Sequence, residues 1–119
     1  MMKILSWNSR GLGHPSKVLA LRDFIHSEKL DIILIQETKL EQREIRGIID
    51  QQKQYKGYTS DSRGAFGGIS TLWDHSKWNC TSINLHQHWI RTVLDNKNDN
   101  QSIVVYNVYA PNNYRENES

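Results

Sequence analysis

The run Asp31-Ile32-Ile33-Leu34-Ile35-Gln36 decides the fold class, because its apolar and β-branched residues are continuous rather than alternating. This composition is typical of a strand buried on both faces. Upstream, Lys3-Ile4-Leu5-Ser6-Trp7 predicts a second short buried strand. Between the two runs, a cap at Ser16 and apolar residues at helical spacing predict a helix that fades near Lys29. A strand, helix, strand order of this kind implies a parallel pair joined by a right-handed crossover.

Downstream of the deciding run, the pattern favours one more helix and then only strands. Thr38 and Glu41 have the spacing of a capping box, so a helix is expected to start there and to carry Ile45, Ile48 and Ile49 on one face. The tract 95–100 is rich in Asn and Asp and predicts a hairpin loop. Strand-like segments are predicted at Ile69–Trp73, Lys77–Asn84, Trp89–Asp95 and Ser102–Val108. The sequence therefore predicts an α/β protein with helices early and a mostly antiparallel sheet later.

Length and composition exclude several classes of protein. The chain has 119 residues, enough for one domain at most, and its formal charge of +2 is too small to indicate nucleic-acid binding by itself. No apolar run approaches the length of a membrane span. The N-terminus turns polar too early for a signal peptide, and the single cysteine, Cys80, cannot form an internal disulfide. These features favour a nuclear or cytoplasmic location rather than secretion.

Two polar residues stand at the ends of the two N-terminal strands. Asn8 follows the first apolar run and Glu37 follows the second. Parallel neighbours bring such strand ends together, where open α/β sheets gather their ligands. A carboxylate beside a carboxamide is an all-oxygen ligand pair that suits Mg²⁺ or Mn²⁺. The alternative is that Asn8 only caps a turn and Glu37 only solvates a strand end.

Three other motifs admit less specific interpretations. Gly11-x-Gly13-x-x-Ser16 resembles an incomplete dinucleotide fingerprint, for which a simple strand-to-helix turn is the alternative. His86-x-His88 has no evident third ligand nearby, so surface histidines are favoured over a metal site. The four tryptophans are expected to pack on the sheet faces. Tyr109-Ala110-Pro111-Asn112 ends the last strand with a hydroxyl and an amide that could donate to a phosphate oxygen, or it is an ordinary strand exit.

Four motifs occur in an order that resembles a known family. They are Ile4 to Gly13 (ILSWNSRGLG), Asp31 to Lys39 (DIILIQETK), Gly67-Gly68, and Asn107 to Asn112 (NVYAPN). Together they are similar to the start of an endonuclease/exonuclease/phosphatase domain. The greatest similarity is to the apurinic-endonuclease-like domain of plant LINE-type (non-LTR) retrotransposons. The resemblance covers nearly the whole chain, from Lys3 to Asn112.

The resemblance implies a fold, an activity and a set of site residues. The family fold is a four-layered α/β sandwich, and its members cleave phosphodiesters with Mg²⁺, here in DNA. By resemblance, Glu37 is the principal metal-binding carboxylate and Asn8 helps to bind the metal or the phosphate. Tyr109 and Asn112 contact the scissile phosphate or the DNA backbone, so these four are the expected catalytic residues. Arg10 and Lys39, which flank the same motifs, are placed near phosphates.

The sequence departs from the family pattern in its later motifs. Gly-Asp-x-Asn, a further Asp and a terminal Ser-Asp-His would follow Tyr109, and the 119 residues do not contain them. Residues 1–119 are thus interpreted as the N-terminal portion of a single domain, a truncated sandwich. Such a portion is expected to be inactive alone. We also expect it to self-associate, because Ile69–Trp73, Trp89–Asp95 and Ser102–Val108 would bury one face against strands that the other half supplies mostly or partly.

The sequence leaves open whether the chain itself is an enzyme. By resemblance it belongs to a metal-dependent endonuclease, and a small-substrate phosphodiesterase of the same superfamily is the nearest alternative. A non-enzymatic relic or binding fragment is the alternative from a different class.

Overall fold

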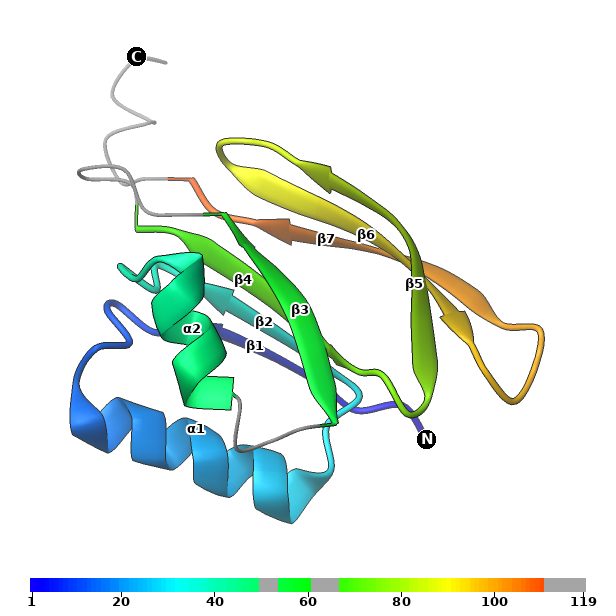
Figure 1. The fold of residues 1–119 in the computed structure, drawn as a ribbon, viewed down its shortest axis with the longest axis horizontal. Helices are drawn as coiled ribbons and strands as arrows, with labels where there is room; N and C mark the ends of the chain where they lie inside the picture. Colours follow the sequence, from blue (N-terminus) through cyan, green and yellow to red (C-terminus); the bar gives the residue numbers. More distant parts are fainter. Residues whose placement is uncertain (50–53, 61–66, 111–119) are drawn as a thin grey trace.

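The computed structural model describes residues 1–49, 54–60 and 67–110, which form three layers (Figure 1). Two helices cover one face of a four-stranded sheet, and a three-stranded sheet covers its other face. The strand order is β1-β2-β4-β3 in the first sheet and β5-β6-β7 in the second. The predicted α/β class, with helices early and antiparallel strands later, is confirmed. The elements are β1 (Ile4–Asn8), α1 (Pro15–Glu28), β2 (Ile32–Gln36), α2 (Gln42–Ile49), β3 (Tyr55–Ser60), β4 (Ile69–Asp74), β5 (Trp78–Leu85), β6 (Trp89–Asn96) and β7 (Ser102–Val108).

The N-terminal strands pair as their sequence predicts. β1 and β2 are parallel, in a register that runs from Ile4 opposite Ile32 to Asn8 opposite Gln36. β4 lies antiparallel to β2 on the other side, and every residue of β4 is buried. Because a central strand between helices and a second sheet has no solvent face, an uninterrupted run of buried residues is what this position requires.

Both helices begin at residues other than the predicted caps. The N-cap of α1 is His14, whose side chain accepts a hydrogen bond from the Ser16 amide, and Pro15 occupies the first turn. Proline suits that position because its missing N–H would have no partner in the helix. The expected Thr38 capping box is also wrong. α2 starts at Gln42, and the fully buried Thr38 hydroxyl instead accepts from the Leu40 amide and donates to the Gly67 carbonyl.

Strand β3 is the one element of the described chain that the sequence pattern missed. It pairs antiparallel with β4, with Tyr55 opposite Asp74 and Ser60 opposite Ile69. Its buried positions are Tyr55 and Thr59, and between them Gly57 lies so close to β4 that a Cβ would come within 2.3 Å of the Thr71 carbonyl oxygen. Because Gly57 has no side chain, β3 lacks the alternation of apolar and polar residues by which a strand is recognised in a sequence.

Two cores hold the layers together. Helix residues such as Leu21, Ile25 and Ile45 pack on one face of the first sheet with Ile33 and Ile35. The second core lies between the sheets and contains Ile32, Trp73, Trp78 and Leu94.

This arrangement corrects the expectation that the predicted later strands pack mostly against strands from the other half of the domain. β4 belongs to the first sheet, whereas β6 and β7 belong to the second, so the chain supplies both sides of its own sandwich. The hairpin predicted at 95–100 joins β6 to β7, where the Asn96 side chain accepts from the amides of Asn98 and Asp99. None of the helices in the described ranges has the length and apolar character needed to cross a membrane.

Candidate active site

The structure places Asn8 and Glu37 at the ends of two adjacent parallel strands, as the sequence predicts. Asn8 ends β1, and Glu37 follows the last residue of β2, the neighbouring parallel strand. Backbone pairing continues past both strand ends, since the Ser9 amide donates to the Gln36 carbonyl (3.0 Å) and the Gly11 amide donates to the Glu37 carbonyl (2.7 Å). The exposed Asn8 side chain accepts a hydrogen bond from the Arg10 amide at 3.2 Å. This bond orients the Asn8 carboxamide at the same edge of the sheet as Glu37.

Backbone conformations of left-handed type gather at this edge. Arg10, Glu37 and Lys39 have φ values of 51°, 56° and 56°, and Gly11 has a φ of 100°. In the described ranges, the other non-glycine residue with positive φ is Lys29, which caps the C-terminus of α1. Such conformations cost roughly 1–3 kcal/mol each, and they tend to occur where function requires a particular side-chain direction.

Gly67 gives the Glu37 side chain the room that it occupies. A Cβ on Gly67 would lie 2.5 Å from Glu37 Cγ and 2.7 Å from its Cα. The Gly67 and Gly68 carbonyls also accept hydrogen bonds from the amides of Lys39 and Thr38. The Gly67-Gly68 motif therefore acts as the backbone wall against which the candidate carboxylate lies.

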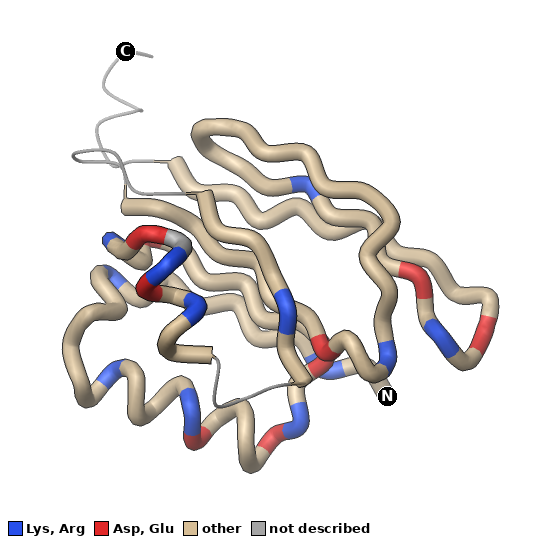
Figure 2. The backbone as a smooth tube through the Cα atoms, viewed as in Figure 1, with Lys and Arg blue, Asp and Glu red and all other residues tan. Residues whose placement is uncertain are grey.

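Cationic side chains surround the same loops. Lys39 Nζ lies 3.8 Å from Glu37 Oε1, and more than half of the Lys39 side chain is exposed. Lys17 Nζ donates to the carbonyl oxygens of Ser9 (2.6 Å) and Arg10 (3.3 Å). Arg10 is exposed. Figure 2 shows Lys and Arg positions on these loops at one end of the molecule, where they provide positive charge for an anionic ligand.

Tyr109 reaches this end of the molecule from the second sheet. It follows β7, and its amide donates to the His88 carbonyl at 2.8 Å. Burial raises the pKa of the Tyr109 hydroxyl above its usual value of 10.0, and the negative charge of Glu37 raises it further. Tyr109 is thus close enough to feel the Glu37 carboxylate and stays a neutral hydrogen-bond donor near pH 7. Asn112, the fourth predicted site residue, lies outside the described residues.

Asn107 is a structural residue beside the site whose role sequence reasoning did not identify. It is 1% exposed on β7 and accepts from Gln36 Nε2 at 2.8 Å. Its own amide donates to the Ser70 carbonyl (2.8 Å) and the Thr71 hydroxyl (3.2 Å). A buried amide in a strand of apolar residues is the sequence signal for such a link, because a buried polar group must find partners. Asn107 fixes the end of β7, and hence Tyr109, relative to the end of β2.

The donor set at Asn8 and Glu37 fits a hard divalent cation. One carboxylate and one amide oxygen at adjacent strand ends match the one or two protein ligands that Mg²⁺ typically takes. The glycine wall at Gly67 leaves the Glu37 side chain a defined position. Over the described part of the chain, no group of three or more His, Cys, Asp and Glu side chains could hold a metal. The pair therefore fits a weak, open site rather than a closed protein cage.

This chain belongs to the Endonuclease/Exonuclease/phosphatase family, whose sequence profile matches residues 5–118. A search of curated proteins found no match. Among solved structures, an AP endonuclease from Leishmania major is similar at 24% identity and a TM-score of 0.70, over 94% of this chain and 41% of that one. The 3′ phosphatase NExo from Neisseria, bound to a product DNA hairpin, is similar at 18% identity and a TM-score of 0.70, over 92% and 41%.

A third similar structure is TDP2 from D. rerio in complex with a single-strand DNA product. It is 13% identical with a TM-score of 0.70, over 88% of this chain and 44% of that one. These likenesses confirm the expected fold, that of the endonuclease/exonuclease/phosphatase type. The chain spans less than half the length of each of these three solved structures.

Proposed function

We propose that this chain carries the metal-binding part of a divalent-metal-dependent phosphoester hydrolase that acts on DNA. The observation that carries the proposal is the convergence of Asn8 and Glu37 at adjacent strand ends, with the Glu37 side chain seated against Gly67. Family membership and the DNA-related names of the similar structures support the substrate class. In this proposal, residues 1–119 are the N-terminal portion of a single domain.

Each site residue has a role that follows from its chemistry. Glu37 and Asn8 hold Mg²⁺ or Mn²⁺, which when bound stabilises negative charge on the phosphate and on the leaving oxygen. Tyr109, kept protonated by burial and by the Glu37 charge, donates a hydrogen bond to a phosphate oxygen. Arg10 and Lys39 provide positive charge for the DNA backbone. Asn112 contacts the same backbone.

We further propose that the domain is of the retrotransposon endonuclease type. The support is the similarity of the four ordered motifs, from Ile4-Leu5-Ser6-Trp7-Asn8 to Tyr109-Ala110-Pro111-Asn112, to the endonuclease-like domain of plant LINE elements.

The role of Glu37 in hydrolysis is tested in a longer chain that contains a Gly-Asp-x-Asn motif, where Glu37→Ala should abolish nicking. Full nicking by that variant would contradict the role of Glu37.

The metal site is tested on the chain itself by Mn²⁺ binding. Glu37→Gln removes the one charged ligand of the pair, so we expect water-proton relaxation by Mn²⁺ to show binding at least ten-fold weaker. Glu28→Gln is the matched control, because Glu28 is an exposed carboxylate whose nearby cation is Lys3 at 3.7 Å, away from the site. Equal binding by the Glu37→Gln variant would refute the assignment.

We propose that the 119 residues alone do not hydrolyse DNA. Within the described ranges no group of three or more His, Cys, Asp and Glu side chains gathers, and the later family motifs that would supply an Asp and a His are not among the 119 residues. General acid–base assistance is worth about 10²–10⁴-fold in rate. Nicking of supercoiled plasmid in Mg²⁺ should match a buffer control. Robust nicking that Glu37→Ala abolishes would show that the chain is a complete minimal enzyme.

A further inference from the structure

The outer face of the second sheet carries an aromatic cluster at the same end of the molecule as the candidate active site (Figure 1). The His86 and Trp89 rings are stacked, with centroids 4.8 Å apart and an interplanar angle of 4°. Tyr106 approaches Trp89 from the neighbouring strand, with centroids 5.9 Å apart and an angle of 58°. His86 and Tyr106 are exposed and Trp89 is half-buried. We call these three residues the aromatic platform.

Backbone and side-chain hydrogen bonds hold the platform in place. The His86 amide donates to the Trp89 carbonyl at 2.9 Å, which closes the turn between β5 and β6. The His88 amide donates to His86 Nδ1 at 3.2 Å and so orients the imidazole ring. Because the rings are fixed in advance, a flat ligand that stacks on them would order few side chains, and binding would cost little conformational entropy.

The platform is connected to the site by short hydrogen-bonded steps. Trp89 is paired with Val108, the last residue of β7, and the next residue is Tyr109. The Tyr109 amide donates to the carbonyl of His88, which lies in the same turn as His86. Figure 1 shows the β5–β6 turn and the end of β7 at the same end of the molecule as the ends of β1 and β2. A chain of nucleotides that runs past Glu37 and Tyr109 would therefore meet the platform.

The charge of the surrounding sequence favours a polyanion. Residues 75–94 and 100–115 contain no Asp or Glu, and Arg91 is the described cation of these stretches on the platform half of the sheet. Arg91 lies on β6 opposite Tyr106 and donates to Asn84 Oδ1 at 3.2 Å. In Figure 2 the acidic positions of this sheet lie toward the β6–β7 turn, away from the platform. Aromatic rings beside a cation, with no carboxylate in the adjoining sequence, are typical of surfaces that stack the bases of single strands.

We infer that the aromatic platform of His86, Trp89 and Tyr106 stacks an unpaired base of single-stranded DNA next to the phosphate held at Glu37. The inference rests on the proposed function, since it extends the DNA path from that site. Stacking contributes about 1–3 kcal/mol per base, or about 5- to 150-fold in affinity, and shows little sequence preference. A second copy of the chain is the other occupant that an exposed apolar face could take, and the experiment separates the two.

The test is fluorescence anisotropy of the 119-residue chain with a labelled dT15 oligonucleotide and with a labelled abasic oligonucleotide of the same length. We expect dT15 to bind at least five-fold more tightly than the abasic strand. Trp89→Ala should remove this difference, and Trp89→Phe should keep most of it. Tyr58→Ala is the matched control, because Tyr58 is an exposed aromatic residue (42%) on the first sheet, and it should bind as the parent does. His86→Ala, at an exposed position in the turn, gives the same expected loss if Trp89→Ala fails to fold.

Three results would overturn the inference. They are no measurable dT15 binding by the parent chain, equal affinity for the abasic strand, and a Trp89→Ala or His86→Ala variant that binds dT15 unchanged. Sedimentation velocity tests whether a second copy of the chain occupies this face instead. If the parent and Trp89→Phe are dimers and Trp89→Ala is a monomer, the face is an interface between two copies. The Glu37→Gln variant should keep dT15 binding in the absence of metal. In the parent chain, Mn²⁺ binding without tighter binding of dT15 than of the abasic strand would contradict the platform alone, and base-dependent dT15 binding without Mn²⁺ binding would contradict the metal site alone.

Discussion

At the scale of single residues, Gly67 controls the position of the candidate metal ligand. An Ala Cβ there would overlap Glu37 Cγ at 2.5 Å and Glu37 Cα at 2.7 Å, so the loop must shift. We predict that Gly67→Ala destabilises the fold by about 1–3 kcal/mol, as overpacking does, and weakens Mn²⁺ binding. Urea unfolding and Mn²⁺ relaxation measure the two effects.

Gly47 is the matched glycine for this comparison. It lies on α2, and a Cβ there would meet nothing within 4 Å. Gly47→Ala should therefore stabilise the fold by up to about 1 kcal/mol through its helix propensity and leave Mn²⁺ binding unchanged. Equal effects of the two substitutions would refute the idea that Gly67 shapes the site.

Tyr55 predicts a pH dependence of stability. Burial and then the charge of Asp74 raise the pKa of its hydroxyl above 10.0, and the hydroxyl donates to the Leu30 carbonyl. As the pH rises through 10, the unfolded chain loses the Tyr55 proton before the folded chain does, so the stability that this proton supports falls with pH. Urea unfolding between pH 8 and 11 should show a shallower fall for Tyr55→Phe than for the parent. Tyr58→Phe, at an exposed position on the same strand, is the control, and identical slopes for Tyr55→Phe and the parent would contradict the prediction.

At the scale of elements, the link between β7 and the first sheet depends on Asn107. Asn107→Leu would leave Gln36 Nε2 without its 2.8 Å partner and the Ser70 carbonyl without a side-chain donor. Buried polar groups left unpaired cost about 1–3 kcal/mol each. We predict a loss of about 2–4 kcal/mol in urea unfolding and a change in the environment of Tyr109, visible by NMR. A variant of Ser102, exposed on the same strand, should show neither effect.

The elements also show which parts of the fold were predictable. The sequence predicted β1, β2 and the last four strands, because apolar runs such as Ile32–Gln36 indicate a strand by their composition alone. The starts of the helices were not predictable. The α1 cap depends on a ring nitrogen of His14, and the Thr38 hydroxyl donates to the Gly67 carbonyl instead of capping α2. β3 was missed because Gly57 replaces a side chain with close backbone contact.

The candidate site was predictable to the extent that it follows from strand ends. Asn8 and Glu37 converge because parallel neighbours end at one edge, which a strand prediction already implies. The contact of Gly67 with the Glu37–Thr38 segment joins residues about 30 positions apart, and the hydrogen bond between Gln36 and Asn107 joins residues about 70 positions apart. A contact of that range depends on the tertiary fold, and local patterns do not contain it.

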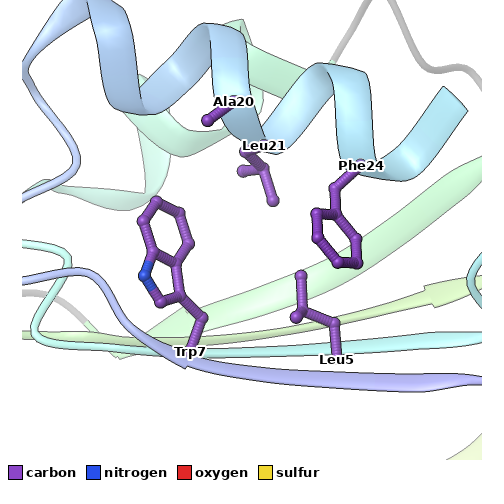
Figure 3. Close-up of a pocket in the computed structure, with 5 residues that line it drawn as sticks. All are labelled: Leu5, Trp7, Ala20, Leu21 and Phe24. Carbon is purple, nitrogen blue, oxygen red and sulfur yellow. The ribbon is translucent and has the colours of Figure 1, made fainter. Parts of the chain in front are cut away.

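At the scale of the whole molecule, the first sheet has an open edge with an apolar pocket beside it. β1 is the edge strand, and the pocket of about 270 Å³ lies between β1 and α1. Figure 3 shows Phe24 and Leu21 of α1 facing Leu5 and Trp7 of β1 across this space. Ile4 is 49% and Phe24 is 48% exposed. An edge strand with free backbone groups next to exposed apolar side chains promotes association.

We therefore predict that the isolated chain self-associates at micromolar concentration and binds a hydrophobic dye, through the β1 edge and this pocket. Phe24→Glu places a charge at the pocket mouth on the exposed face of α1, so it should shift the sedimentation profile toward monomer and reduce dye fluorescence several-fold. Val104→Glu adds the same charge on the outer face of the second sheet, where Val104 is 52% exposed, and should leave association unchanged. A parent chain that is monomeric, binds no dye and unfolds in one sharp thermal transition would contradict the prediction. In that case the two sheets would form a self-sufficient unit, because the Trp73–Trp78–Leu94 core between them would then be enough to stabilise the fold without any partner at β1.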